Sequence, residues 1–285
     1  MDIEMVVIEL KNKGRLKTEI AEIKILTGGT TSKLYLLKGQ DQSKWVVKFN
    51  KPQVIQAEAY FLQFYEEIPL IPKVIYVEET YKYIVYSYVD GLTNYQRGNK
   101  RELLTSIVQS LLNHYKTVGN SHEWGWADET TSSWENFLLQ RVHEAGEIIG
   151  HVLENENEKL VIDIIKKSKI DEEEPYLVHG DCGVHNFLFE ESSLSGVIDP
   201  TPVYGYPLYD LIYSFCSSPD DLTKETIYSA ANLLKIKPQS NHRLNEEVLI
   251  GLFLRISSCI KYHPIDLPLY LEAWNNWKEI VLKKL

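Results

Sequence analysis

Residues 177–186 read LVHGDCGVHN, and within them Asp181 is followed five positions later by Asn186. Two short apolar runs follow at 187–189 and 196–198, joined by a polar segment, and this pattern predicts a β-hairpin that ends at Asp199. Phosphoryl transfer needs a carboxylate that accepts the proton of the acceptor hydroxyl, and hard oxygen ligands that hold Mg²⁺ against the phosphates. Asp181, Asn186 and Asp199 supply these groups.

A lysine and a glutamate upstream fit the same chemistry. Lys48 lies in the apolar run 45–49, which predicts a strand, and Glu58 lies on a helix predicted from Pro52 to Tyr65. Taken alone, they would be an exposed strand lysine and an exposed helix glutamate. Beside the downstream motif, a lysine held by a helix glutamate is expected to reach nucleotide phosphates.

The segment 26–33, LTGGTTSK, lies between two predicted strands and is predicted to form the loop over the phosphates. Its glycines allow close approach of the backbone, and its hydroxyls add hydrogen-bond donors. It is not a Walker A loop, because no Gly-Lys-Ser/Thr follows at the required offset.

The hydrophobic period changes once along the chain. From about residue 20 to 89 the apolar runs are those of strands, apart from the helix at 52–65. After Asp90-Gly91, apolar residues from Leu103 to Tyr115 recur at helical spacing, and Ser132 with Glu135 forms a Ser-x-x-Glu capping box before a further helix. The pattern predicts an α+β protein with a β-rich domain at 1–89 and a larger, mainly helical domain at 90–285.

These motifs resemble the aminoglycoside phosphotransferase family, a branch of the kinase-like fold that also includes choline, fructosamine and other small-molecule kinases. The matching segments are His179-Gly180-Asp181 with Asn186, Val197-Ile198-Asp199-Pro200, and Tyr209-Asp210-Leu211. Locally, His-Gly-Asp-x-Gly-x-x-Asn is most similar to the hygromycin B phosphotransferase branch. The resemblance implies a bilobal protein-kinase-like fold.

The resemblance also implies roles for individual residues. Asp181 would be the catalytic base, Asn186 and Asp199 would bind Mg²⁺, and Asp210 and His179 would give structural support to the catalytic loop. The nucleotide, ATP or GTP, would be bound by Lys48, Glu58, Gly28, Gly29, Thr30, Thr31, Ser32, Tyr86, Ser87 and Tyr88.

Composition limits the partners. The chain has 285 residues with 30 Lys+Arg and 40 Asp+Glu, a net charge of −10, which argues against nucleic-acid binding because phosphate neutralisation needs clustered basic residues. No charge-free apolar run is long enough to span a membrane, and three widely spaced cysteines fit reduced thiols. We expect a cytoplasmic protein that acts as a monomer or weak dimer.

The acceptor is expected to be a small molecule. Only residues 200–209 separate Asp199 from Asp210, and no Ala-Pro-Glu-like anchor exists, so a peptide platform has no room. The acidic charge and the hygromycin-like segment favour an aminoglycoside or similar amine-bearing alcohol, and hence antibiotic resistance. The alternatives are a metabolic kinase of choline, fructosamine or sugar type, or a nucleotide-binding module without turnover.

Overall fold

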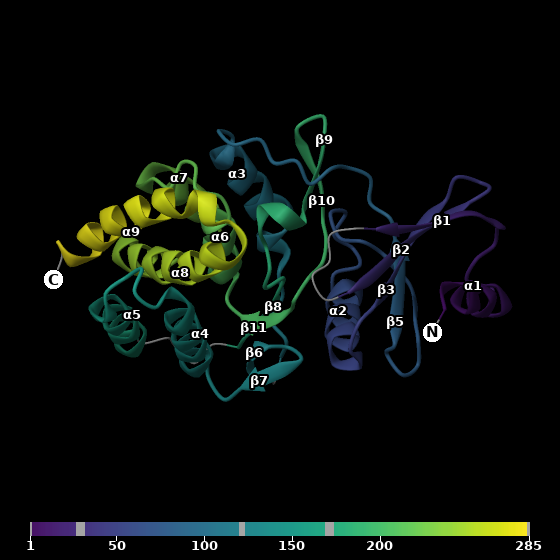
Figure 1. The fold of residues 1–285 in the computed structure, drawn as a ribbon, viewed down its shortest axis with the longest axis horizontal. Helices are drawn as coiled ribbons and strands as arrows, with labels where there is room; N and C mark the ends of the chain where they lie inside the picture. The colour runs from purple at the N-terminus through teal and green to yellow at the C-terminus, as the bar shows by residue number, and fades with distance from the viewer. Residues whose placement is uncertain (1, 27–31, 120–122, 169–173, 284–285) are drawn as a thin grey trace. The chain divides into compact units, whose positions relative to one another are not determined.

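A sheet of five antiparallel strands forms the centre of the N-terminal part of the chain, in the order β1-β2-β3-β5-β4 (Figure 1). The computed structural model describes residues 2–26, 32–119, 123–168 and 174–283. The strands are β1 (Ile20–Leu26), β2 (Lys33–Gly39), β3 (Lys44–Phe49), β4 (Val74–Val77) and β5 (Tyr83–Ser87). The predicted strand at 45–49 is thereby confirmed as β3.

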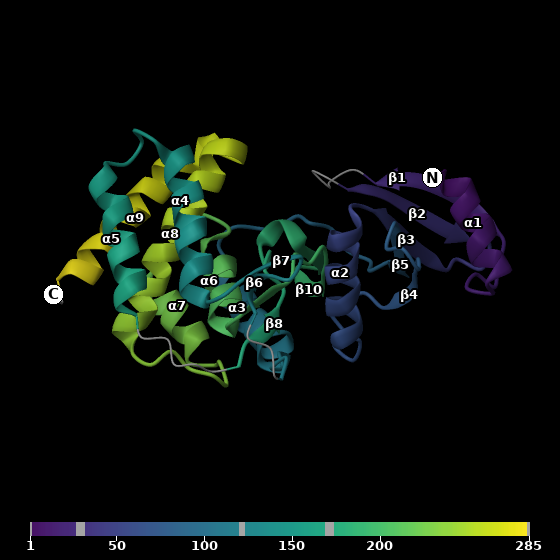
Figure 2. The same cartoon turned by 90° about the horizontal axis from the view of Figure 1, so that it is seen from below.

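Helices cover both faces of this sheet. Helix α1 (Ile3–Asn12) packs Val6, Val7 and Leu10 into a buried cluster with Val47 and Val85, among others. Helix α2 (Pro52–Phe64) lies on the other side of the sheet, as Figure 2 shows. Because side chains alternate along a strand, Lys48 faces the side opposite to Val47, toward α2. The predicted helix at 52–65 is confirmed, whereas α1 was not predicted.

The hairpin of β9 (Phe187–Glu190) and β10 (Ser193–Val197) groups with this sheet, although it is distant in sequence. The first compact unit comprises Met1–Leu92 and Leu188–Thr201, and the second comprises Thr93–Phe187 and Pro202–Leu285. The N–H of Val197 donates to the carbonyl of Leu70 at 2.9 Å. Gly91 has a φ of +132°, and a Cβ there would lie 2.7 Å from Ser195 Oγ, so glycine permits the close approach.

The two units differ from the predicted domains in two respects. The predicted boundary at residues 89/90 falls three residues before the first change of unit, and the prediction assigned residues 188–201 to the helical domain. The structure groups that hairpin with the first unit because its hydrogen bonds are made there, through the paired residues Leu92 and Phe189.

The second unit combines a four-stranded sheet with seven α-helices in its described residues. The strand order is β7-β6-β11-β8, from β6 (Trp124–Trp126), β7 (Glu129–Thr131), β8 (Tyr176–Val178) and β11 (Val203–Gly205). The helices are α3 (Lys100–Ser110), α4 (Trp134–Ile149), α5 (Asn155–Lys167), α6 (Pro207–Cys216), α7 (Lys224–Ala231), α8 (Asn241–Tyr262) and α9 (Leu267–Leu282). Helix α8 packs against α4, α5, α6 and α9 (Figure 1). The α+β class is therefore confirmed.

One predicted helix cap is wrong by a single residue. The N-cap of α4 is Ser133, whose Oγ accepts the N–H of Asn136 at 3.0 Å. Ser132 instead accepts from the side-chain amide of Asn136 at 2.9 Å. Two adjacent serines could cap the helix, and Ser133 is the one whose hydroxyl reaches the backbone N–H of the third helical residue.

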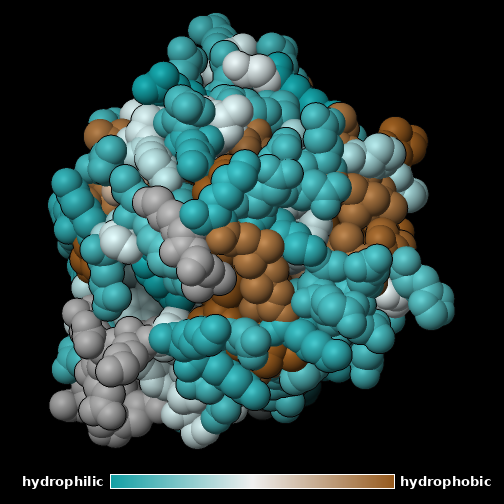
Figure 3. Space-filling model, turned by 90° about the vertical axis from the view of Figure 1, so that its left-hand side faces the viewer, coloured by the Kyte–Doolittle hydropathy of each residue, from teal (hydrophilic) through white to brown (hydrophobic). Residues whose placement is uncertain are grey.

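The surface of the second unit is largely polar. Figure 3 shows its outer face, where hydrophilic side chains predominate and hydrophobic patches interrupt them. Within the described ranges, no helix combines the length and apolar character needed to cross a membrane. Cys182, Cys216 and Cys259 are buried free thiols, as the sequence predicted.

Candidate active site

Lys48, on β3, lies between two carboxylates of the first unit. Its Nζ is 2.6 Å from Glu58 Oε2 on α2, and it donates a short hydrogen bond to Asp199 Oδ1. The side chains of Lys48 and Glu58 are 3% and 1% exposed, whereas that of Asp199 is 43% exposed. The buried Lys48 is thus held by the buried Glu58 and also contacts Asp199, whose carboxylate is accessible to solvent.

The electrostatics of this trio keep the lysine charged. Burial alone would lower the pKa of Lys48, but the charges of Glu58 and Asp199 outweigh it and raise the pKa. Burial also raises the pKa of Glu58, and Lys48 opposes that shift. An ammonium group held this way is suited to binding an anion such as a phosphate.

Asp199 has an unusual backbone conformation. Its φ is +58°, in the left-handed region that few residues other than glycine adopt, although aspartate tolerates it better than most. The residue lies two positions after Val197, the last residue of β10. Such strained positions cluster at functional sites.

The other residues predicted to bind the nucleotide are partly described. Gly28, Gly29, Thr30 and Thr31 lie outside the described residues. Ser32 Oγ accepts from Asn50 Nδ2 at 2.8 Å. Tyr86 and Ser87 end β5, and Tyr88 follows. The N–H groups of Ser87 and Tyr88 already donate to the carbonyls of Lys73 and Lys44, so these two amides are committed within the first unit.

In the second unit, a buried aspartate braces the loop that carries Asp181. Asp210, on α6, has no exposed surface and accepts from the N–H groups of His179 at 2.8 Å and Gly180 at 3.0 Å. Tyr115 Oη also donates to it, at 2.7 Å. Gly180 has a φ of +79°, which turns the chain so that two successive amides point at one carboxylate. Burial raises the pKa of Asp210 to about 7 despite these donors.

Three side chains hold the carboxylate of Asp181. His185 Nε2 lies 3.1 Å from Oδ2, and Asn186 Nδ2 donates to Oδ2 at 2.9 Å. Tyr213, on α6, donates a short hydrogen bond to Oδ1. The Asp181 side chain is 27% exposed, so a small molecule can reach it. The contacts fix the orientation of a carboxylate that still faces solvent.

These contacts also set the charge of Asp181. Burial alone would raise its pKa, but the hydrogen bonds from His185 and Tyr213 outweigh that effect and hold the pKa well below the usual range. The group is therefore an anion at neutral pH, as a proton acceptor must be.

The possible metal ligands offer oxygen atoms. The amide nitrogen of Asn186 donates to Asp181 O and Oδ2, which leaves its Oδ1 for a cation, and Asp199 offers its carboxylate. Such hard oxygen donors suit Mg²⁺. Among the described residues, no cluster of three or more His, Cys, Asp or Glu side chains could hold a metal ion alone. This fits Mg²⁺ that is bound by one or two protein groups together with substrate phosphates.

The structure thus gathers the predicted site residues into two sets, one in each unit. The first contains Lys48, Glu58 and Asp199, and the second contains His179, Asp181, Asn186 and Asp210. Sequence reasoning missed His185, Tyr213 and Tyr115 as partners of these acids. Of the three, only His185 had a local signal, because it lies inside the quoted catalytic stretch.

The fold and these two sets define the class of the protein, which is that of kinase-like phosphotransferases that act on small molecules. The sequence model of the phosphotransferase enzyme family, APH, matches residues 22–231. The chain belongs to this family. A search of curated proteins found no match.

Solved structures share the fold. The streptomycin–ATP–APH(2")-IIa ternary complex is 21% identical with a TM-score of 0.62, over 96% of this chain and 98% of that one. An ADP-bound aminoglycoside phosphotransferase, APH(2'')-Ib, is 19% identical with a TM-score of 0.59, over 99% of each chain. A thermostable mutant of aminoglycoside phosphotransferase APH(4)-Ia, bound to AMP-PNP and hygromycin B, is 15% identical with a TM-score of 0.56, over 96% and 97%.

Proposed function

We propose that the protein transfers the γ-phosphoryl group of ATP, or of GTP, to a hydroxyl of a small molecule. The observation that carries this proposal is Asp181, an ionised and partly exposed carboxylate oriented by three side chains on a braced loop. In the transfer, the acceptor oxygen bonds to the γ-phosphorus as its bond to the β–γ bridging oxygen breaks. The hydroxyl proton passes to Asp181, and the nucleoside diphosphate leaves.

The remaining residues position the nucleotide. Lys48 binds its phosphates and Glu58 holds Lys48 in place, while Asn186 and Asp199 would bind Mg²⁺. When bound there, Mg²⁺ would supply positive charge against the negative charge of the phosphates. The sequence predicts that residues 28–32 bind the phosphates and that Tyr86, Ser87 and Tyr88 bind the base. The resemblance supports these roles, together with the charged and buried state of Lys48.

For the acceptor, the sequence favours an amine-bearing alcohol of aminoglycoside type, which would make the activity one of antibiotic resistance. Two structures with the same fold contain streptomycin and hygromycin B. The metabolic alternative stays open, because its enzymes share the catalytic residues named above. The cytoplasmic location and the monomeric or weakly dimeric state stay predictions of the sequence.

The test is release of ADP from Mg·ATP by the full chain with a panel of aminoglycosides, sugars, amino alcohols and hydroxy acids, with products identified by mass spectrometry. Asp181→Asn should lower turnover by ~10²–10⁴-fold and leave the affinity for ATP unchanged. Asp163→Asn, an exposed aspartate on α5, is the matched control. If the protein binds ATP but no panel compound is phosphorylated, or if Asp181→Asn retains turnover, the proposal fails.

A further inference from the structure

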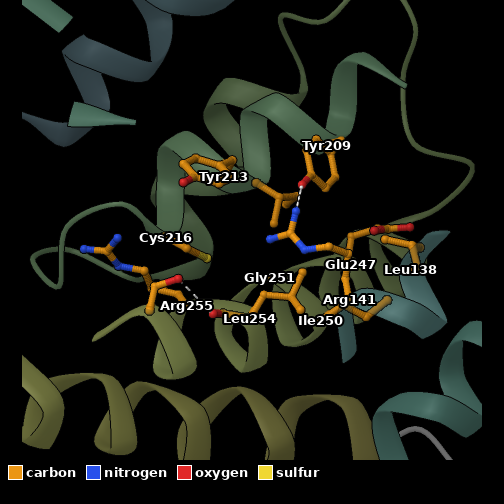
Figure 4. Close-up of a pocket in the computed structure, with 12 residues that line it drawn as sticks. Leu138, Arg141, Tyr209, Tyr213, Cys216, Glu247, Ile250, Gly251, Leu254 and Arg255 are labelled. Atoms are coloured by element: carbon orange, nitrogen blue, oxygen red, sulfur yellow. Dashed lines mark hydrogen bonds between the residues drawn. The ribbon is translucent and has the colours of Figure 1, made fainter. Parts of the chain in front are cut away.

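A pocket lies between three helices of the second unit. Helix α4 contributes Leu138 and Arg141, α6 contributes residues from Tyr209 to Cys216, and α8 contributes residues from Glu247 to Ser258 (Figure 4). A Cβ on Gly251 would lie 2.3 Å from Ile212 Cγ2, so α6 and α8 are nearly in contact at this point. We call this the α4–α6–α8 pocket.

The pocket borders the carboxylate of Asp181. Tyr213 lines the pocket and also donates its short hydrogen bond to Asp181 Oδ1. A hydroxyl group is therefore already bound to the atom that would accept the acceptor's proton. Tyr213 therefore connects the wall of the pocket to the carboxylate of the proposed base.

The guanidinium of Arg141 lines the pocket and has no carboxylate partner among the described residues. The guanidinium of Arg141 lies over the rings of Trp126 and Phe137, at 4.8 and 5.9 Å, and Nη1 donates to Tyr209 Oη at 3.1 Å. Figure 4 shows it between Tyr209 and helix α8. Across the described ranges, no carboxylate lies within ion-pair distance of it. Its remaining N–H donors need an acceptor, because a half-buried guanidinium is costly to leave unpaired.

The pocket has two other charged residues, Glu247 and Arg255. Glu247 forms an ion pair with Arg243, one turn earlier on α8. Arg255 donates from Nε to Tyr270 Oη at 3.1 Å, and Figure 4 shows its guanidinium directed away from Arg141. Neither arginine of the pocket has a carboxylate within ion-pair distance among the described residues. Arg141 is the one that lies among the apolar side chains, which are Leu138, Ile212, Ile250 and Leu254.

We propose that the acceptor is an alcohol with an apolar body and a carboxylate, and that Arg141 binds this carboxylate while the hydroxyl reaches Asp181. A guanidinium matches the two oxygens of a carboxylate in a bidentate pair. The guanidinium of Arg141 balances a single negative charge, and the apolar walls fit a hydrocarbon body. The inference rests on the proposed phosphotransfer.

This acceptor differs from the amine-bearing class that the sequence favours. Each amine of an aminoglycoside would meet Arg141, and the one carboxylate of the pocket, Glu247, is already paired. The net charge of −10 describes the whole surface and does not describe this pocket. The charge of the pocket therefore favours an anionic alcohol, a class of acceptor outside the choline, fructosamine and sugar types named above. In the balanced reaction, the hydroxy acid gives up its hydroxyl proton to Asp181, gains the phosphoryl group and keeps its carboxylate.

The test compares three sets of unbranched probes of graded length, which are ω-hydroxy acids, the corresponding hydroxy amides, and amino alcohols. Calorimetry measures their binding to the full chain, and mass spectrometry measures their phosphorylation with Mg·ATP. The acid should bind about tenfold or more tightly than the amide, as expected for a hydrogen bond to a charged group. Arg141→Gln should bring that ratio to about one, and Arg141→Lys should keep part of it.

Arg101→Gln, the same change at an exposed position on α3, should keep the wild-type ratio. Equal binding of acid and amide, tighter binding of the amino alcohol, no binding of any acid, or an unchanged ratio in Arg141→Gln would each overturn the inference. Phosphorylation of amines without a preference for acids would leave the proposed function standing. An acid preference that depends on Arg141, without any phosphorylated product, would instead count against the proposed function.

Discussion

The hydroxyl of Tyr213 donates a hydrogen bond to Oδ1 of Asp181, and the same tyrosine forms part of the wall of the α4–α6–α8 pocket. The proposed catalytic carboxylate and the α4–α6–α8 pocket therefore share one side chain of α6. The contact fixes the carboxylate and, through its charge, sets the proton affinity of the proposed base.

Tyr213→Phe should move the acid limb of the pH profile upward. The hydrogen bonds from His185 and Tyr213 hold the pKa of Asp181 below its ordinary value against the effect of burial, so removal of one of them raises that pKa. The base must be ionised, so kcat/KM should begin to fall at a higher pH than in the wild type. Tyr262→Phe, at an exposed position on α8, should leave the profile unchanged. Superimposable profiles for Tyr213→Phe and wild type would contradict the assignment.

Lys48→Met should destabilise the fold by about 3–5 kcal/mol near pH 8, because it leaves the Glu58 carboxylate buried without its partner. Without Lys48, the pKa of Glu58 in the folded state stands further above its unfolded value of 4.5. Ionisation of Glu58 then favours the unfolded chain, so the loss of unfolding free energy increases as pH rises above 4.5. Urea unfolding at pH 5 and pH 8 measures it.

Lys24→Met, an exposed lysine on β1, is the control for that series, and Lys48→Met with Glu58→Leu should recover part of the lost stability. A double variant no more stable than Lys48→Met would show that the unpaired Glu58 charge is not the cause.

Asp210→Asn should lower the unfolding free energy by about 1–3 kcal/mol and slow turnover, because an amide has one acceptor oxygen where three donors converge. The pKa of Asp210 is raised from 3.8 to about 7, so its stabilising effect is complete below 3.8 and decreases as pH rises through about 7. Wild type should therefore exceed the variant by more at pH 5 than at pH 8 in urea unfolding. An advantage that increases with pH would mean that the folded state prefers the charged carboxyl.

Lys100→Met should destabilise the C-terminal end of α6. Lys100 is 1% exposed, and its Nζ donates to the carbonyls of Phe215 at 2.9 Å and Ser218 at 2.7 Å. Each carbonyl left without a donor costs about 1–3 kcal/mol. Burial lowers the pKa of Lys100 from 10.5 to about 8, so wild-type stability should rise relative to the variant between these values. Thermal unfolding from pH 7 to pH 10 tests this, with the exposed Lys159→Met as control.

Local patterns in the sequence predicted the parts of the fold that depend on nearby residues. The apolar alternation around Lys48 identified β3, and the five-residue spacing from Asp181 to Asn186 identified a loop that the Asn186 side chain closes on itself. Helix α1 was not predicted, although Ile3, Val6, Val7 and Leu10 have helical spacing.

Contacts between distant segments could not be predicted in the same way. Arg141 and Tyr209 are 68 residues apart, and Tyr213 and Asp181 are 32 apart. Each pair meets only through the packing of α6 against other segments, which are α4 for Arg141 and the loop after β8 for Asp181. The angle and register of such packing depend on the whole set of buried side chains. The charge of the pocket could not be predicted either, because neither Arg141 nor Glu247 lies in a sequence motif.

The hairpin of β9 and β10 belongs to the first unit. Residues 93–187, which belong to the second unit, are synthesised after Leu92 and before this hairpin. When residues 1–92 have left the ribosome, all five strands of the sheet have been made. The hairpin residues that contact Leu70, Gly91 and Leu92 have not yet been synthesised. Domains generally fold as they emerge, from the N-terminus onward. This unit cannot be finished before residue 201 leaves the exit tunnel, so Asp199 reaches Lys48 only after the chain of the catalytic loop has been made.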